Sequence, residues 1–311
     1  MKTIVFDAHC DTPVELWRKN AHLAENAGQV SLKRAQQLDG YIQFFAFCTP
    51  WLADGCSCRE RYLAAYDYFQ TELRHTGAAA RQCRSTQDAE AALQAGQMGV
   101  FFSIEGAESL NCDPGLLESA HAQGVRMVNP VWNHENALAG SCVTGGGFTP
   151  QGLDFCRAAE RLGVLLDVSH LSDRGFWQLC EHASRPFVAS HSNARAVCAH
   201  PRNLTDEQFR ALCDCGGVAG VNLYADFLRE DAPATLDDVY RHIDHFLELG
   251  GDGHLCLGGD LDGCERLPEG FGGVNDYRKL QDYLHARGYA EAVLENLFYK
   301  SLMKVVKLCT M

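Results

Sequence analysis

The chain has 311 residues, 46% of them hydrophobic, and its 27 basic and 40 acidic side chains give a formal net charge of −13. This negative balance argues against nucleic acid as a partner and opposes binding to an anionic membrane surface. No window approaches the roughly 18 apolar residues of a membrane span, and the first residues lack the long apolar segment of a signal peptide. We therefore expect a soluble, cytoplasmic protein that binds neither nucleic acid nor membrane.

The 15 cysteines are an odd number and are spread along the chain. Some of them, such as Cys48 and Cys256, lie inside apolar runs, where a thiol behaves as a small hydrophobic side chain. The close pairs at positions 56 and 58 and at positions 213 and 215 are spaced too tightly for a zinc knuckle. We expect reduced thiols in a reducing compartment.

Eight short apolar runs recur along the chain, and segments with helical periodicity separate them. Residues typical of helix starts precede three of these segments, at Thr149, Ser172 and Thr205. Eight strands that alternate with helices predict a (β/α)8 TIM barrel. A doubly wound open sheet is the rival fold, but the glycine-rich phosphate turn that it needs after its first strand is missing. The runs are residues 4–6, 42–47, 100–104, 125–131, 164–168, 187–189, 218–221 and 255–257.

The segments outside these runs also fit a single barrel. A long connection over residues 51–58 leads into a predicted helix over 59–73, and residues 276–311 predict two or three closing helices. The sequence has no internal repeat, no low-complexity tract and no linker rich in proline and glycine. We therefore predict one domain over residues 1–311.

The first apolar run leads directly into His9 and Asp11. Residues two apart in a strand point to the same side, so this imidazole and this carboxylate are expected to converge as in a metal-binding corner. Histidine and aspartate also meet by chance at strand ends, so the pair alone does not decide the matter.

Later strands end in matching side chains. Glu105 follows the third run, where a carboxylate is costly to bury unless it joins an ion pair or a metal. His170 follows the fifth run, His191 the sixth, and Asp260 and Asp262 the eighth. One histidine at a strand end is more often a hydrogen-bonding residue than a ligand. Here, five of the eight strands present such side chains at the end where barrel active sites lie.

The number of candidate ligands indicates two metal ions. His9, Asp11, Glu105, His170 and His191 are one more than a closed tetrahedral zinc site uses. Glu105 can bridge two ions, with the first two residues on one ion and the two later histidines on the other, and such ions can share a hydroxide. Imidazole and carboxylate ligands favour zinc, although manganese, cobalt and iron are compatible with them.

The motifs around these positions resemble those of the membrane (renal) dipeptidase family of zinc metallopeptidases, in the same order along the chain. The resemblance implies a barrel of the metal-dependent amidohydrolase type that cleaves dipeptides, often tolerating a D-residue at the C-terminal position. Bacterial cytoplasmic relatives are a better comparison than the membrane-anchored animal enzymes. The motifs are Asp7-Ala8-His9-Cys10-Asp11, Ser103-Ile104-Glu105-Gly106, Asp167-Val168-Ser169-His170, Ser190-His191-Ser192-Asn193, His200-Pro201-Arg202-Asn203-Leu204, Gly258-Gly259-Asp260-Leu261-Asp262-Gly263 and Leu267-Pro268-Glu269-Gly270-Phe271.

The resemblance also implies roles for single residues. The five candidate ligands hold two zinc ions, with Glu105 and a hydroxide as bridges. Arg202 resembles the arginine that holds the substrate carboxylate, and Asp260 the acid/base aspartate. Asp262 would share the face of Asp260 by strand alternation but stand farther out, so Asp260 is the expected base.

The sequence departs from the mammalian pattern at the end of the fourth strand. Mammalian members have a histidine there that contacts the substrate, and Trp132 takes its place in this chain. An indole N–H can donate a hydrogen bond but cannot accept one. Trp132 could therefore stabilise an oxyanion but could not accept a proton. His134, two residues on, is the alternative, and both residues are candidates for substrate binding.

The sequence therefore predicts a metal-dependent dipeptidase that acts on substrates with a free C-terminal carboxylate. A different amidohydrolase activity at the same site, such as an N-acyl amino-acid deacylase or a lactonase, stays open because one fold hosts many chemistries. A catalytically lapsed metal-binding scaffold is the alternative from another class, and Asp260 and Arg202 beside all five ligands argue against it. A homodimer is compatible with the sequence, which says nothing more about assembly.

Overall fold

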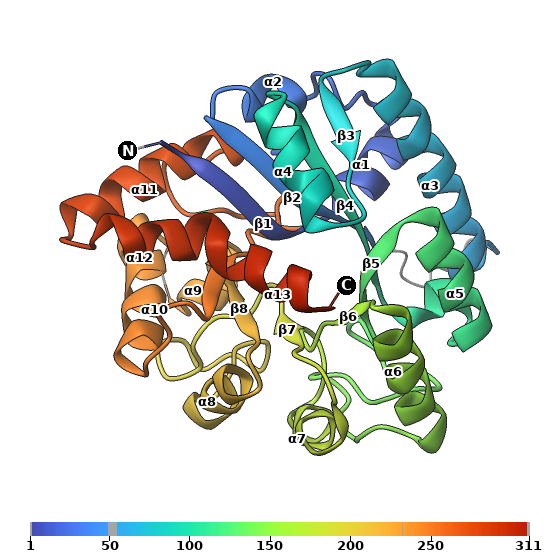
Figure 1. The fold of residues 1–311 in the computed structure, drawn as a ribbon. Coiled ribbons are helices and arrows are strands. Elements are labelled where there is room, and N and C mark those ends of the chain that lie inside the picture. The colour runs from blue at the N-terminus through green and yellow to red at the C-terminus, as the bar shows by residue number, and fades with distance from the viewer. Residues whose placement is uncertain (1, 49–54, 232, 310–311) are drawn as a thin grey trace.

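Eight parallel strands form the centre of the computed structural model, which describes residues 2–48, 55–231 and 233–309. They are hydrogen-bonded in the order β6-β5-β4-β2-β1-β9-β8-β7, and Figure 1 shows the helices around them. This nearly closed barrel confirms the predicted fold. The strands are β1 (Ile4–Cys10), β2 (Gly40–Cys48), β4 (Met98–Glu105), β5 (Val125–Asn129), β6 (Leu165–Leu166), β7 (Val188–Ala189), β8 (Val218–Val221) and β9 (Leu255–Leu257).

The barrel is least regular between β6 and β7. These strands share no ladder; an isolated parallel bridge joins Asp167 to Val188, and the amide of Val168 donates to the carbonyl of Val188 at 2.7 Å. The predicted strand 164–168 is therefore regular only over Leu165 and Leu166. A short strand that the apolar pattern did not predict, β3 (Ala80–Gln82), pairs with the start of β4.

Helices α2 to α8 begin where a capping side chain accepts a hydrogen bond from an amide of the first turn. The three predicted helix starts are confirmed, because Thr149, Ser172 and Thr205 accept hydrogen bonds from the third residue of α6, α7 and α8. The predicted helix 59–73 is α3, whereas residues 49–54 of the connection before it lie outside the described residues. The first eight α-helices along the chain are α1 (Thr12–Lys19), α2 (Leu32–Ala35), α3 (Cys58–His75), α4 (Thr86–Gln94), α5 (Pro114–Gln123), α6 (Pro150–Leu162), α7 (Asp173–His182) and α8 (Asp206–Asp214).

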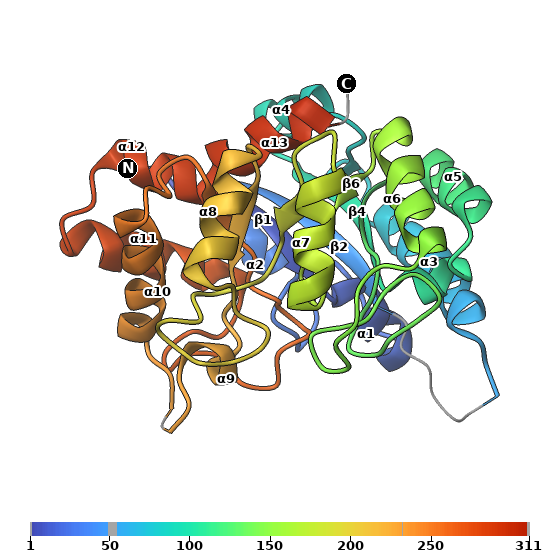
Figure 2. The same ribbon diagram turned by 90° about the horizontal axis from the view of Figure 1, so that it is seen from below.

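The C-terminal segment closes one end of the barrel. Leu302, Val305 and Val306 of α13 pack into the barrel interior with Phe6 and Phe44. Figure 2 shows α13 at one end, and α1 and α9, which follow the carboxyl ends of their strands, at the other. The open end is therefore the one that carries the predicted ligands. The remaining helices are α9 (Ala225–Leu228), α10 (Leu236–Glu248), α11 (Tyr277–Ala286), α12 (Glu291–Glu295) and α13 (Ser301–Cys309), with a π-helical turn over Asn296–Lys300.

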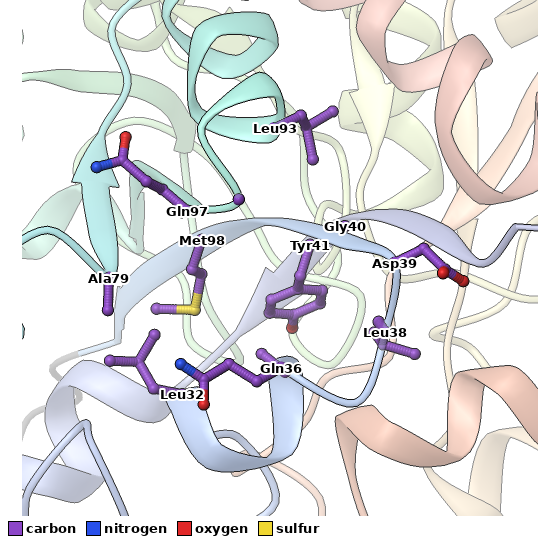
Figure 3. Close-up of a pocket in the computed structure, with 12 residues that line it drawn as sticks. Leu32, Gln36, Leu38, Asp39, Gly40, Tyr41, Ala79, Leu93, Gln97 and Met98 are labelled. Atoms are coloured by element: carbon purple, nitrogen blue, oxygen red, sulfur yellow. The ribbon is translucent and has the colours of Figure 1, made fainter.

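A pocket of about 170 Å³ lies at the amino-terminal ends of β2 and β4. Figure 3 shows the side chains of Leu32, Tyr41, Leu93 and Met98 around it. These strand ends are opposite the carboxyl ends, so the pocket is separate from the predicted ligands. Within the residues that the structure describes, no helix is both long and apolar enough to cross a membrane.

Candidate metal centre

The carboxyl ends of the strands bring six of the predicted site residues together. His9 is the last residue but one of β1 and Glu105 is the last of β4, whereas Asp11, His170, His191 and Asp260 lie just beyond the strands they follow. Three overlapping groups of their donor atoms each lie within 4.8 Å of one another. The groups are His9, Asp11 and Glu105; Glu105, His170 and His191; and His9, His191 and Asp260.

Glu105 occupies the middle of this cluster. Its Oε1 lies 2.8 Å from His170 Nε2, 3.3 Å from His191 Nε2 and 3.7 Å from His9 Nε2. The Nε2 atoms of His170 and His191 are 3.0 Å apart. One buried carboxylate oxygen thus faces three imidazole nitrogens, and these are donor groups that can bind a metal ion.

The surroundings of His9 fit a cation. Its Nε2 lies 3.7 Å from oxygens of Asp11, Glu105 and Asp260, and its side chain is fully buried. In the described part of the chain neither ring nitrogen has a hydrogen-bond partner, and Asp11 Oδ1 also lacks one. Because unpaired buried polar atoms are costly, a cation bound among these donors would remove the penalty. Imidazole and carboxylate donors suit zinc and related divalent ions.

The titration of these groups reflects their crowding. Burial disfavours the charged form of His9, but Glu105, Asp11 and Asp260 together outweigh it and raise the pKa of His9 to about 10. Burial, reinforced by the charge of Glu105, raises the pKa of Asp11 to about 7. Burial also raises the pKa of Asp260. Several carboxylates therefore compete for protons here, and a divalent cation would keep them ionised.

Neutral imidazoles face the other side of the cluster. Burial, together with the nearby charge of Arg202, lowers the pKa of His170 to about 4. Burial and the charge of His9 lower the pKa of His191 well below its usual range. Neutral histidines are the form that binds metal.

Asp260 and Asp262 have different surroundings although they are two residues apart. Asp260 Oδ1 faces His9, and its Oδ2 accepts a hydrogen bond from Asn222 Nδ2 at 3.1 Å. Asp262 instead accepts from the amide of Gln29 at 2.6 Å and the hydroxyl of Thr12 at 2.7 Å. Strand alternation does not apply, because β9 ends at Leu257 and both aspartates have positive φ, at 56° and 64°.

Arg202 lies beside the ligand cluster. Its side chain is buried, and Nη2 donates to the carbonyl of His191 at 3.4 Å. The guanidinium carbon is 5.4 Å from the centre of the Phe227 ring. Its Nε has no hydrogen-bond partner among the described residues. A buried cation with free donor capacity at this position can bind an anionic group of a substrate.

Trp132 and His134 stand at different depths. The Trp132 ring is 6.2 Å from the ring of His170 and is partly buried. His134 is exposed, and its ring is 5.9 Å from that of Trp132. Trp132 is thus the one of the two that lies next to a predicted ligand.

Two asparagines near the ligands were missed by the sequence analysis. Asn133 Oδ1 lies 2.8 Å from His170 Nδ1, and Asn222 Nδ2 donates to Asp260. Asn133 lies between the two candidates Trp132 and His134, so its position was a signal. Asn222 directly follows the apolar run 218–221 and so shares the strand-end position of the other site residues.

Comparison with known proteins places the chain in a family. Residues 1–310 match the family model of the membrane dipeptidases (peptidase family M19). The chain belongs to the membrane dipeptidase family. As a member of this family it is a hydrolase and a metal-dependent dipeptidase.

Individual relatives cover most of the chain. An uncharacterised protein in the pqqA 5′ region of Klebsiella pneumoniae is 37% identical over 247 residues, which are 76% of this chain and 91% of that protein. An uncharacterised dipeptidase of Schizosaccharomyces pombe is 33% identical over 193 residues, 60% of this chain and 46% of that one. A metallopeptidase from Rhodobacter sphaeroides, liganded with a phosphinate mimic of the dipeptide L-Ala-D-Ala, is 27% identical with a TM-score of 0.92, and 99% of this chain and 100% of that one are covered.

Proposed function

We propose that this dipeptidase uses two divalent cations, zinc in the first place, to hydrolyse dipeptides that have a free C-terminal carboxylate. The observation that carries the proposal is the position of Glu105 Oε1, which faces the Nε2 atoms of three histidines within 3.7 Å. A D-residue is proposed as acceptable at the C-terminal position, because the similar Rhodobacter sphaeroides metallopeptidase is liganded with a mimic of L-Ala-D-Ala.

His9, Asp11, Glu105, His170 and His191 would hold the two cations, with Glu105 shared between them. When bound, such ions polarise a carbonyl and make a water nucleophilic near neutral pH. The roles of the nearby residues follow from where they stand relative to these five.

Arg202 is proposed to hold the substrate carboxylate. Its planar guanidinium can donate two parallel hydrogen bonds to a carboxylate, and its place beside His191 restricts the substrate length. With the carboxylate held so near the ligand cluster, only one residue fits beyond the scissile bond. A dipeptide is the substrate that this layout favours.

Asp260 is proposed to accept the proton of the attacking water and to deliver it to the leaving amine. Its carboxylate faces the cluster, and the amide of Asn222 holds one of its oxygens. Trp132, rather than the exposed His134, is proposed to donate its indole N–H to the developing oxyanion, because its ring adjoins His170. The cytoplasmic location, the single domain and the homodimer stay predictions from the sequence.

Metal content and substrate range test the proposal together. Protein purified without chelator should contain close to two equivalents of divalent metal and should cleave L-Ala-D-Ala and L-Ala-L-Ala. N-acetyl-D-alanine and lactones should be poor substrates. Full peptidase activity after complete removal of metal would contradict the dinuclear site, and faster turnover of N-acyl amino acids or lactones would replace the dipeptidase activity with one of the alternatives.

A further inference from the structure

Asp167 is a fully buried carboxylate that has no place in the proposed reaction. It follows β6, and within the described residues it makes no ion pair. Its Oδ1 accepts two backbone hydrogen bonds, from the amides of Ser169 at 3.0 Å and Ser190 at 2.9 Å. Its Oδ2 accepts a hydrogen bond from the hydroxyl of Ser190.

Ser190 connects this carboxylate to a candidate ligand. Its Oγ lies 2.6 Å from Nδ1 of His191. A hydroxyl can donate only one hydrogen bond, and Ser190 donates it to the carboxylate of Asp167. Ser190 Oγ can therefore only accept a hydrogen bond from the imidazole. Nδ1 must then carry the ring proton, and Nε2, on the Glu105 side, is left unprotonated.

We propose that Asp167 and Ser190 form a relay that holds His191 in the tautomer with a proton on Nδ1 and so presents Nε2 to a metal ion. The inference rests on the proposed function only in taking His191 as a metal ligand. Asp167 and Ser190 are positioning residues, since neither lies among the donor groups of the cluster. Such partners fix the ring orientation and raise the basicity of the ligating nitrogen.

The backbone around the relay is held rigidly. A Cβ atom at Gly220 or Gly258 would lie 1.8 Å or 1.7 Å from the carbonyl oxygen of Ser190, so β8 and the residue after β9 lie directly against this segment. The amide of His191 also donates to Ser169 Oγ at 3.0 Å. The imidazole is therefore held at its backbone by packing and at Nδ1 by the relay.

The main test compares two serines of the same segment. Ser190→Ala removes the relay, whereas Ser192→Ala removes an equally buried hydroxyl whose partner is Ser169 Oγ at 3.2 Å and not an imidazole. Zinc affinity is measured by chelator competition, and thermal unfolding of the metal-free proteins checks folding. Ser190→Ala should bind zinc about 10- to 100-fold more weakly than wild type, and Ser192→Ala about as tightly. Equal affinities, or equal losses in both variants, would overturn the relay.

Asp167→Asn tests the direction of the hydrogen bonds in the relay. An amide NH₂ would donate to Ser190 Oγ, the hydroxyl would turn its proton toward His191 Nδ1, and the ring proton would move to Nε2. This variant should lose at least as much zinc affinity as Ser190→Ala. An affinity equal to that of the wild type would show that the carboxylate does not set the tautomer.

A measurement on the wild type decides the matter even if a variant fails to fold. In the zinc-loaded, ¹⁵N-histidine-labelled protein, the Nδ1 proton of His191 should give a resonance protected from solvent exchange, and Ser190→Ala should lose this protection. A His191 that binds no zinc, or that carries no protected Nδ1 proton, would overturn the proposal. A wild type that binds zinc with this resonance but cleaves no dipeptide would remove the proposed activity and leave the relay standing.

Discussion

Two seams of the barrel lack a regular ladder, and each of them contains a pair in which one residue is a buried aspartate. Asp7 pairs with Leu257 between β1 and β9, and Asp167 pairs with Val188 between β6 and β7. Where a regular ladder is missing, a carboxylate can accept the amides that would otherwise be unpaired. Both aspartates do so at the barrel end that carries the site.

The two aspartates differ in what lies beyond them. Asp7 accepts from the amides of His9 and Gly259, at 2.8 Å and 3.0 Å, and from the hydroxyl of Tyr277 on α11. It also accepts from the Gln43 side chain of β2 at 3.1 Å, and none of these donors is an imidazole. The hydrogen bonds of Asp167 continue through Ser190 to an imidazole. We infer that the first seam positions backbone alone, whereas the second also orients a ligand.

The largest effect is expected at Asp260, which follows β9 on the Asp7 seam. Asp260→Asn keeps the size of the side chain and a hydrogen-bonding group but cannot accept a proton at working pH. Turnover of L-Ala-D-Ala should fall by roughly 10²- to 10⁴-fold, while metal content measured by elemental analysis stays near that of the wild type. Asp262→Asn, the control, should lower turnover far less. Loss of metal from Asp260→Asn would show that Asp260 is a metal ligand and would contradict its role as the proton acceptor.

The free energy of unfolding should fall in acid because His242 of α10 is buried as a neutral imidazole. This buried imidazole accepts the amide of Ala194 at Nδ1 and faces the carbonyl of Leu228 with Nε2, both at 3.1 Å, and burial lowers its pKa to about 4. Since the ordinary pKa of histidine is about 6.5, the unfolded chain binds the extra proton between these values. Its contribution to stability is complete above pH 6.5 and is lost as the pH falls toward 4, on the order of 3 kcal/mol at most.

The measurement for His242 compares urea unfolding of metal-free wild type and His242→Gln from pH 7 to pH 4. Glutamine can accept and donate hydrogen bonds but does not titrate in this range. The advantage of the wild type should shrink as the pH falls. Parallel stability profiles of the two proteins would show that His242 does not contribute to the acid sensitivity.

Arg202, which follows β7, is expected to govern selectivity rather than the chemical step. Hydrogen bonds to charged groups contribute about 1.5–3 kcal/mol, or about 10- to 150-fold in kcat/KM. Arg202→Ala should lose this factor with free dipeptides, and wild type should lose at least as much with C-terminally amidated ones. For amidated dipeptides, kcat/KM of the variant should be only slightly lower than that of the wild type. Equal turnover of free and amidated dipeptides by the wild type would remove Arg202 from this role.

The smallest effect is expected at Tyr277, and it tests the contrast between the seams most directly. Tyr277→Phe removes one donor to Asp7, which keeps its hydrogen bonds from the amides of His9 and Gly259. Urea unfolding of the metal-free protein should show a loss of about 1 kcal/mol, typical of one hydrogen bond. Zinc affinity should stay at the wild-type value. A loss of affinity as large as that of Ser190→Ala would mean that both seams orient ligands.

The barrel, the end of it that carries the site and the ligand candidates could all be predicted from the sequence. Apolar runs that alternate with helical segments are local patterns, and residues such as His9 and Glu105 are tied to the strand ends by their position in the chain. Parallel strands bring their carboxyl ends together, so the pattern alone groups these two side chains although they are far apart along the chain.

The hydrogen bonds that support these residues could not be predicted from the sequence and are seen in the folded chain. The bond from Ser190 to Asp167 joins residues 23 apart across strands that share no ladder, so no periodicity fixes their register. Asp260 and Asp262 separate because both lie beyond β9 with positive φ, where strand alternation no longer directs side chains. Hydrogen bonds of this kind depend on backbone placement to within a fraction of an ångström, which packing of the whole barrel sets and local sequence does not.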